Sequence, residues 1–189
     1  MAHERTDSYV NDSTSLFQYY KKLGENAIAQ CPDLGLVAQV DPESNSIGMI
    51  VKHLAGNMRS RWTEFLTTDG EKPSRNRDTE FEDPPKNRTE ILDLWDGGWK
   101  CVFTALAALS DADLTKTVTI RGEEHSVMQA INRQIAHYSY HVGQIVFLAK
   151  HFAGTNWKSL TVAKSKSQEF NATWHQARSL SVNGFWTSM

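Results

Sequence analysis

Apolar side chains recur every three or four residues in four separate stretches of the chain, which is the spacing of an amphipathic helix. The stretches predict helices over residues 8–30, 45–65, 89–109 and 126–152. No segment alternates apolar and polar residues for long enough to form a large sheet. The pattern therefore predicts an all-α fold, a four-helix bundle. The expected core seam of the first helix is Leu16, Tyr20, Leu23 and Ala27.

Residues typical of helix termini support this division. Ser44 or Asn45 is the expected N-cap of the second helix, and Ser126 is the expected N-cap of the fourth. Inside the third helix, Gly97 and Gly98 each cost about 1 kcal/mol relative to alanine. This glycine pair indicates either a bend in the helix or a close approach of another backbone.

The connections between the helices differ greatly in length. Residues 67–88 form a long polar connection with three prolines and one bulky apolar residue, Phe81. A helix of 20 residues is about 30 Å long, and 22 extended residues span more than about twice that distance. This crossover can therefore return along the bundle and let the second and third helices run parallel. Residues 117–124 alternate briefly around Gly122 and predict a small hairpin before the fourth helix.

Composition narrows the class of protein. The 189 residues, 40% hydrophobic and 22% charged, are typical of one globular domain, which we place at residues 1–172, followed by a C-terminal tail at 173–189. The net charge of −2 gives no reason to expect nucleic acid or an anionic membrane as a partner. The longest apolar run, residues 145–149, is too short to span a membrane. Cys31 and Cys101 form no C-x-x-C pair, which favours a reduced, cytoplasmic setting.

Three histidines lie where a core helix face is expected. His137 and His141, in HYSYHVGQI, are one helical turn apart and share a face. Imidazoles buried there need partners, so they are either hydrogen-bonded core residues or ligands of a metal. His53 lies among apolar neighbours in the middle of the second helix, so three imidazoles can converge as an open metal site. Tyr138 occupies the position of the glutamate in H-E-x-x-H, and no carboxylate base is expected beside the site.

Four segments also carry a likeness to a known family: KHLAGNMRSRW, FLTTDGEKPSRNRDTEF, HYSYHVGQI and KSLTVAKSKSQEFNA, at residues 52–62, 65–81, 137–145 and 158–172. They resemble the DinB/YfiT-like superfamily, most closely its branch once described as a domain of unknown function. The resemblance implies an up-down-down-up four-helix bundle that forms a homodimer. It also implies a divalent ion, zinc or nickel, bound by three histidines that fall on His53, His137 and His141.

The resemblance implies a range of functions. Superfamily relatives include enzymes that use low-molecular-weight thiols, which implies a metal-dependent enzyme that activates such a thiol cosubstrate for S-transfer to an electrophile. A thiol with a pKa of about 8.5 needs less activation than water at about 15.7. The alternatives are a metal-dependent hydrolase that activates water and a non-catalytic, metal-stabilised dimer related to stress.

Four further residues are candidates for binding a small-molecule substrate. Asn57 and Arg61 follow His53 at intervals of one turn on the same helix face, so both can line a pocket beside the histidines. Arg75 and Arg77, in the long connection, can bind a carboxylate of the cosubstrate. The alternative for all four is an ordinary capping or surface role.

Overall fold

The structure is a computed structural model that describes residues 5–173 of the chain. It is mostly helical, as predicted, and its small two-stranded sheet is the predicted hairpin. Three short 3-10 turns, Asp78–Glu80, Asp111–Asp113 and Gly154–Asn156, lie between or after the main elements. The main elements are α1 (Tyr9–Gln30), α2 (Asp33–Val37), α3 (Ile47–Trp62), α4 (Arg88–Ala107), β1 (Thr117–Ile120), β2 (Glu123–Ser126) and α5 (Val127–Ala153).

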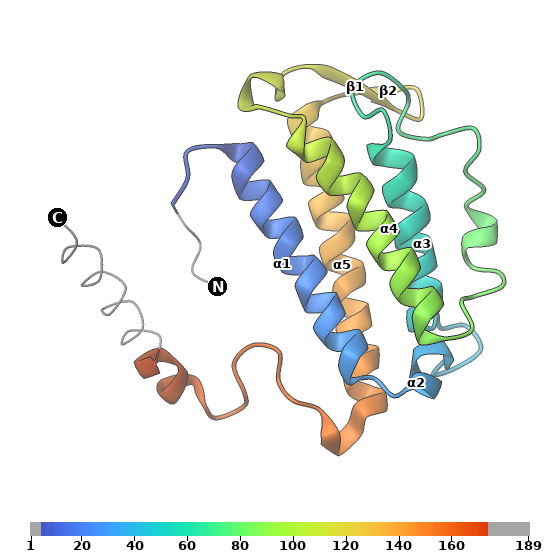
Figure 1. Cartoon of the computed structure of the whole chain (residues 1–189), viewed down its shortest axis with the longest axis vertical. Coiled ribbons are helices and arrows are strands. Elements are labelled where there is room, and N and C mark those ends of the chain that lie inside the picture. The colour runs from blue at the N-terminus through green and yellow to red at the C-terminus, as the bar shows by residue number, and fades with distance from the viewer. Residues whose placement is uncertain (1–4, 174–189) are drawn as a thin grey trace. The chain divides into compact units, whose positions relative to one another are not determined.

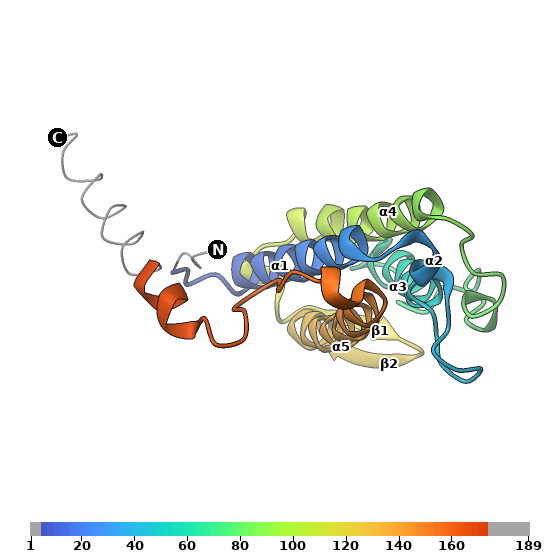
Figure 2. The same cartoon turned by 90° about the horizontal axis from the view of Figure 1, so that it is seen from below.

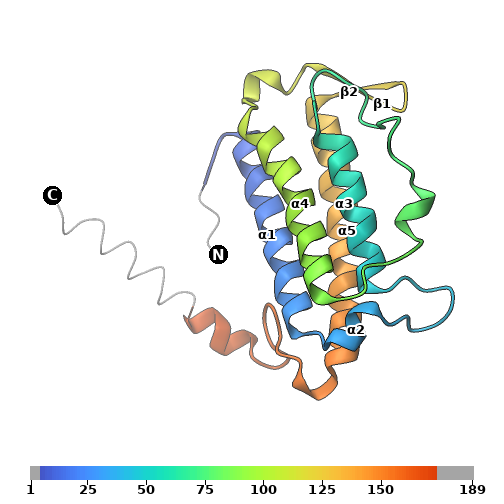
Figure 3. The same cartoon turned by 45° about the vertical axis from the view of Figure 1, so that its right-hand side comes forward.

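The four long helices lie side by side (Figure 1). Helix α1 packs against α4 and α5, and α3 packs against the same two helices. Figure 2 shows α4 and α5 on opposite sides, with α1 and α3 between them. Residues 63–87, which we call the link, leave one end of α3 and return along its outer side to the other end, where α4 begins (Figure 3). The link thus passes alongside the middle of α3.

Side-chain caps fix where α3 and α5 begin. The hydroxyl of Ser126 accepts a hydrogen bond of 3.1 Å from the backbone N–H of Gln129, as predicted for an N-cap. The prediction for α3 is wrong by one or two residues, because its N-cap is Ser46 rather than Ser44 or Asn45. The Ser44 hydroxyl instead closes a turn with the backbone of Asp41.

Aromatic side chains fill the space between the long helices. Trp99 packs edge-on against both Trp95 and Tyr138, with ring centroids 5.5 and 5.6 Å apart. Phe17 of α1 is fully buried and makes an edge contact with Trp62 at 5.6 Å. The predicted seam of α1 is confirmed at Ala27, which is fully buried, but Leu16, Tyr20 and Leu23 are only half-buried. Phe17 and Ile28 are the large side chains of α1 that are fully buried instead.

The glycine pair of α4 marks a close approach of two helices. A Cβ atom at Gly98 would lie 3.1 Å from the Cα of Ala55 and 2.9 Å from the sulfur of Met58, both on α3. Helix α4 runs unbroken through this point. The close approach, rather than a bend, explains why glycine is needed at position 98.

A two-residue turn joins β1 to β2. The strands are antiparallel, and Ile120 pairs with Glu123. Arg121 and Gly122 both have positive φ, 57° and 76°, as a type I′ turn requires. The carboxylate of Asp69, in the link, accepts hydrogen bonds from the backbone N–H groups of both turn residues, at 2.9 and 2.8 Å. The turn is thereby attached to the start of the link.

The chain divides into a compact unit of residues 1–155 and a second unit of residues 156–189. In the second unit, residues 167–173 are helical. The predicted boundary between domain and tail, at residues 172 and 173, stays a prediction because residues 174–189 lie outside the described part of the chain. Among the described residues, no helix has the length and apolar character needed to cross a membrane.

Candidate metal centre

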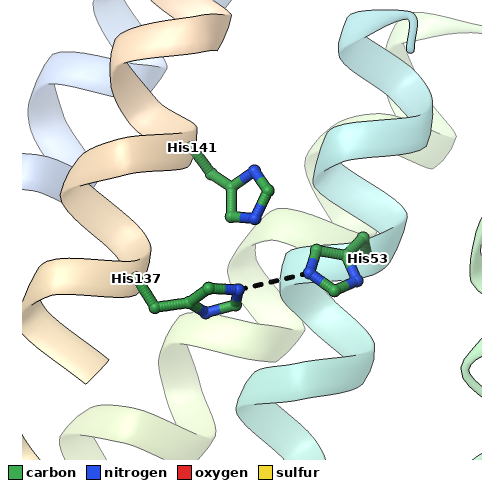
Figure 4. Close-up of side chains that lie close together, drawn as sticks. All are labelled: His53, His137 and His141. Carbon is green, nitrogen blue, oxygen red and sulfur yellow. Dashed lines mark hydrogen bonds between the residues drawn. The ribbon is translucent and has the colours of Figure 1, made fainter. Parts of the chain in front are cut away.

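Helices α3 and α5 bring the three predicted histidines together (Figure 4). His53 comes from the middle of α3, whereas His137 and His141 come from successive turns of α5. The Nε2 atoms of His53 and His137 are 3.3 Å apart. One ring nitrogen from each histidine lies within 4.8 Å of the other two. The three side chains thus form a cluster with the spacing of a metal site.

The outer nitrogens of two rings have oxygen partners. Nδ1 of His53 lies 2.8 Å from a carboxylate oxygen of Glu80, and Nδ1 of His141 lies 2.8 Å from the amide oxygen of Gln144. Both oxygens are acceptors, so each Nδ1 carries the proton and donates it. The Nε2 atoms of both neutral rings then present a lone pair to the centre of the cluster. Nδ1 of His137 is buried and has no hydrogen-bond partner among the described residues.

This arrangement fits a divalent ion. Two nitrogens about 2.0–2.1 Å from a tetrahedral zinc ion are roughly 3.3–3.4 Å apart, which matches the 3.3 Å between His53 and His137. A carboxylate or carbonyl acceptor on the outer nitrogen is typical of metal-binding histidines. Without a metal, the neutral ring of His137 can carry its proton on Nε2 and donate it to Nε2 of His53. The donor set therefore has the chemistry and the spacing to bind a metal ion.

The two histidines of α5 are held neutral. Burial, together with the neighbouring His141 and His53, lowers the pKa of His137 to about 3. Burial also lowers the pKa of His141, and His53 adds to this effect, although the hydrogen bond with Gln144 opposes it. Neutral imidazole is the form that binds a metal, so protons compete weakly for both side chains near neutral pH.

Glu80 was not expected beside the site. Its carboxylate accepts hydrogen bonds of 2.7 and 2.9 Å from Arg75 in addition to the one from His53. Burial raises the pKa of Glu80, but the hydrogen bonds from His53 and Arg75 outweigh it and hold the pKa below its usual value. The prediction of no nearby carboxylate is thus wrong, because the link carries one to the outer side of His53.

One feature of the sequence points to this part of the link. Phe81, the one bulky apolar residue of residues 67–88, stacks on the ring of His53 with centroids 5.1 Å apart. Its neighbour Glu80 is only 5% exposed and packs so closely on Gly56 that a Cβ atom there would displace its carboxylate. An isolated phenylalanine in a polar segment is therefore a usable indication of where the segment attaches.

The histidines line a cavity of about 700 Å³. The four predicted substrate-binding residues, Asn57, Arg61, Arg75 and Arg77, all line it. Sequence reasoning missed Arg121, Arg133 and Gln134, which also line it but come from the hairpin turn and from α5. The cavity thus has five arginines, and no aspartate or glutamate is among its described lining residues.

These arginines differ in how far they are already paired. Arg61 and Arg75 are buried and form ion pairs with Glu71, and Arg75 also binds Glu80. Arg77 and Arg133 are exposed and form no ion pair with a described residue. The unpaired guanidinium groups are therefore the ones available to an anionic ligand.

A buried hydrogen-bond chain orients Asn57. The indole N–H of Trp62 donates to the hydroxyl of Tyr138 at 2.9 Å, and that hydroxyl lies 3.1 Å from the amide oxygen of Asn57. Indole nitrogen is only a donor, so the single proton of Tyr138 goes to Asn57. The NH₂ group of Asn57 is then left to donate to a ligand in the cavity.

Comparisons with known proteins agree with this fold. Residues 4–166 match the family described as "Protein of unknown function (DUF1572)". A solved crystal structure of a DinB-like protein from Bacillus cereus ATCC 10987 is similar, with a TM-score of 0.56 and 18% identity over 78% of this chain and 94% of that one. At this identity the likeness concerns the fold alone. No curated protein matches the sequence.

Proposed function

The chain belongs to the DUF1572 family within the DinB-like superfamily, and from this we propose that it is a metal-dependent enzyme that transfers a low-molecular-weight thiol to an electrophile. The observation that carries the proposal is the composition of the histidine cavity, which has five arginines and no carboxylate among its described lining residues. Such a cavity favours an anionic cosubstrate. Once the three histidines hold a metal, the described lining offers no carboxylate to take a proton from water.

A thiol suits this cavity better than water does. When bound at the three histidines, a divalent ion lowers the pKa of a thiol and favours the thiolate. Each unit of pKa corresponds to about 1.4 kcal/mol, so a thiol at about 8.5 needs several kcal/mol less stabilisation than water. The thiol loses its proton to solvent, and its sulfur forms a bond to an electrophilic carbon as the bond between that carbon and its leaving group breaks. The leaving group departs with the electron pair of the broken bond. Neither Cys31 nor Cys101 is needed as a nucleophile.

The surrounding residues have separate tasks in this proposal. Glu80 and Gln144 hold the rings of His53 and His141 with Nε2 facing inward. Arg77 and Arg133 attract the negative charge of the cosubstrate, because both are exposed and unpaired among the described residues. The amide of Asn57, oriented by Tyr138, donates a hydrogen bond to it.

Metal analysis is the first test. We expect purified protein to retain about one equivalent of zinc or nickel, and the variants His53→Ala, His137→Ala and His141→Ala to lose most of it while keeping their helical circular dichroism. His151→Ala is the matched control, because His151 is exposed on the same helix and lies outside the cluster. Equal metal retention in the cluster variants and the control would remove the basis of the proposal.

A thiol-consumption screen is the second test. We expect the metal-loaded protein to conjugate a model electrophile with a small thiol, and both a chelator and His141→Ala to abolish the reaction. The variants Cys31→Ser and Cys101→Ser should retain it. Metal-dependent ester or amide hydrolysis at full rate without a thiol would identify a hydrolase instead. Inactivity in both assays would favour the non-catalytic, metal-stabilised protein.

We also propose the up-down-down-up bundle and the homodimer of the superfamily. The course of the link alongside α3 supports the connectivity, since it leads from one end of α3 to the opposite end before α4 begins (Figure 3). Sedimentation equilibrium of the full chain tests the dimer. A mass of one chain across the accessible concentration range would contradict it.

A further inference from the structure

We infer that the substrate bound at this site has two parts, an anionic group on one side of the histidines and an apolar group on the other. The inference rests on the proposed function, because it names the class of molecule that the histidine cavity takes. Three observations carry it: a second cavity, the order of residues along α3 and α5, and the distribution of charge.

A second cavity, of about 540 Å³, adjoins the histidine cavity. The two share Asn45, Tyr140 and Gln144 among their lining residues. Its walls include large apolar side chains that are partly open to solvent, and Phe147 is 71% exposed and Tyr140 62% exposed. A ligand in the histidine cavity can therefore extend onto an apolar surface. The apolar side chains of this surface are Ile50, Tyr140, Phe147 and Leu148.

The apolar and polar walls lie on opposite sides of the histidines. On α3, Ile50 precedes His53 by about one turn and Asn57 follows it by one turn. Helix α5 runs in the opposite direction (Figure 1), so Gln134 lies toward the same end as Asn57, and Leu148 toward the same end as Ile50. The site is thus polar toward the hairpin end and apolar toward the α2 end.

The polar wall has hydrogen-bonding capacity that the described residues do not use. Gln134 is only 3% exposed, and its amide oxygen is buried without a partner among the described residues. The Nε atom of Arg61 is buried and likewise unpaired. Both residues line the histidine cavity, as does Asn57 with its free NH₂ group. Buried groups of this kind cost about 1–3 kcal/mol each when unpaired. An anionic group can accept hydrogen bonds from Arg61 and Asn57, whereas the amide oxygen of Gln134 needs an N–H or O–H donor of the same ligand.

Charge fixes the orientation of the ligand. The histidine cavity is lined by five arginines, whereas Glu43 is the charged residue among those lining the apolar cavity. An anionic group is therefore attracted to the first and repelled from the second. The anion and the apolar group can occupy the site in one direction only.

Binding of a homologous series tests this directly. We would titrate the full-length protein, zinc-loaded and metal-free, with butane-, hexane- and octanesulfonate and with the corresponding primary alcohols, by calorimetry. Sulfonates are weak metal ligands, so their affinity reports on the walls of the site. We expect each added methylene to tighten sulfonate binding about two- to fourfold, as burial of a CH₂ group does. The alcohols should bind at least tenfold more weakly than sulfonates of equal length.

Two variants test the apolar part and the anion-binding part of the site separately. Phe147→Ser should flatten the dependence on chain length, weakening octanesulfonate at least fivefold and butanesulfonate less than twofold. Arg133→Gln should weaken every sulfonate about three- to tenfold and leave the alcohols unchanged. Met128→Ser is the matched control, because Met128 is 40% exposed on the same helix and lines neither cavity.

Other outcomes would overturn the inference. These are affinities independent of chain length in the wild type, alcohols that bind as tightly as sulfonates, or equal effects of Met128→Ser and Phe147→Ser. A change in sedimentation mass for Phe147→Ser with an unchanged slope would show that the apolar surface joins two copies of the chain. Because the titrations require no turnover, their failure is distinguishable from that of the thiol assay. A protein that transfers a thiol but shows no dependence on chain length keeps the proposed function and loses this inference.

Discussion

The carboxylate of Glu80 accepts a 2.8 Å hydrogen bond from Nδ1 of His53, although 27 positions separate the two residues in the chain. This contact selects the His53 tautomer whose Nε2 faces the other histidines. It also makes that nitrogen more basic, since a negatively charged acceptor withdraws proton density from Nδ1. The orientation and basicity of a metal-binding nitrogen thus depend on a residue of the link as well as on the helices.

Glu80→Gln keeps the shape of the side chain and removes its charge. We expect this substitution to weaken metal binding by about tenfold or more, which is typical when a metal-binding histidine loses its hydrogen-bond acceptor. Competition titrations with a chelating dye measure the affinity. Glu71→Gln is the matched control, because Glu71 pairs with Arg61, Arg75 and Arg121 and with no histidine. It should lower stability without a comparable loss of metal affinity. Equal losses of metal affinity in the two variants would mean that both substitutions disturb the link as a whole.

Tyr138→Phe interrupts the buried chain between Trp62 and Asn57. The indole N–H and the amide oxygen would both lose their hydrogen-bond partner, so we expect the free energy of unfolding to fall by about 1–3 kcal/mol. In a chain of this size that lowers Tm by about 2–4 °C per kcal/mol. Tyr140→Phe, at a hydroxyl on a 62% exposed side chain, should change stability by less than about 0.5 kcal/mol. Calorimetric melting of the two variants compares them.

Adjacent glycines of α4 should respond to alanine with opposite signs. At Gly98 a Cβ meets the backbone of Ala55 at 3.1 Å, so overpacking should destabilise Gly98→Ala by about 1–2 kcal/mol. At Gly97 the nearest atom is a terminal nitrogen of Arg59 at 3.4 Å, which can move aside. Gly97→Ala should therefore gain about 0.5–1 kcal/mol from helix propensity. Urea unfolding at equilibrium measures both, and changes of the same sign would contradict the close approach of α3 and α4.

Alkylation of Cys31 should keep accelerating at alkaline pH. Burial raises the pKa of its thiol to about 11, with Asp33 adding to the effect and Arg88 opposing it. Because only the thiolate reacts, the alkylation rate should rise about tenfold per pH unit from pH 7 through 9.5, whereas an ordinary thiol levels off above about 8.5. Iodoacetamide labelling followed by mass spectrometry gives the profile. A plateau near pH 9 would show that Cys31 is not shielded from water.

The sequence identified those parts of the site that depend on local spacing. His137 and His141 follow from one helical turn, and His53 follows from its place on an apolar helix face. Glu80 could not be found in this way, because its contact depends on how the link folds back along α3. Arg121 and Arg133 were not predicted for the same reason, since they reach the cavity only through the packing of the hairpin and α5 against α3.

The fold shows the same division between local and long-range information. Ser126 caps the start of α5 and Gly154 caps its end, each through contacts with the adjacent turn of the helix. Both ends of α5 could therefore be predicted from the sequence. The buried face of α1 is set instead by distant aromatic partners. Phe17 occupies the core because Trp62, Trp99 and Tyr138 surround it, whereas periodicity alone predicted Leu16 in its place and was right at Ala27.

The link is fastened at points that contain no metal ligand. Asp69 binds the hairpin turn, the carbonyl of Gly70 accepts from Ser60 and Arg61, and Glu80 packs on Gly56. The three ligands belong to helices, whereas Glu80, which orients His53, and its partner Arg75 belong to the link, so mutation can alter the link without changing a ligand. Evolution can therefore vary the reactivity of the site by exchanging residues 71–79 without rebuilding the core. The same segment is the natural target for a library that aims to redirect the chemistry of this scaffold.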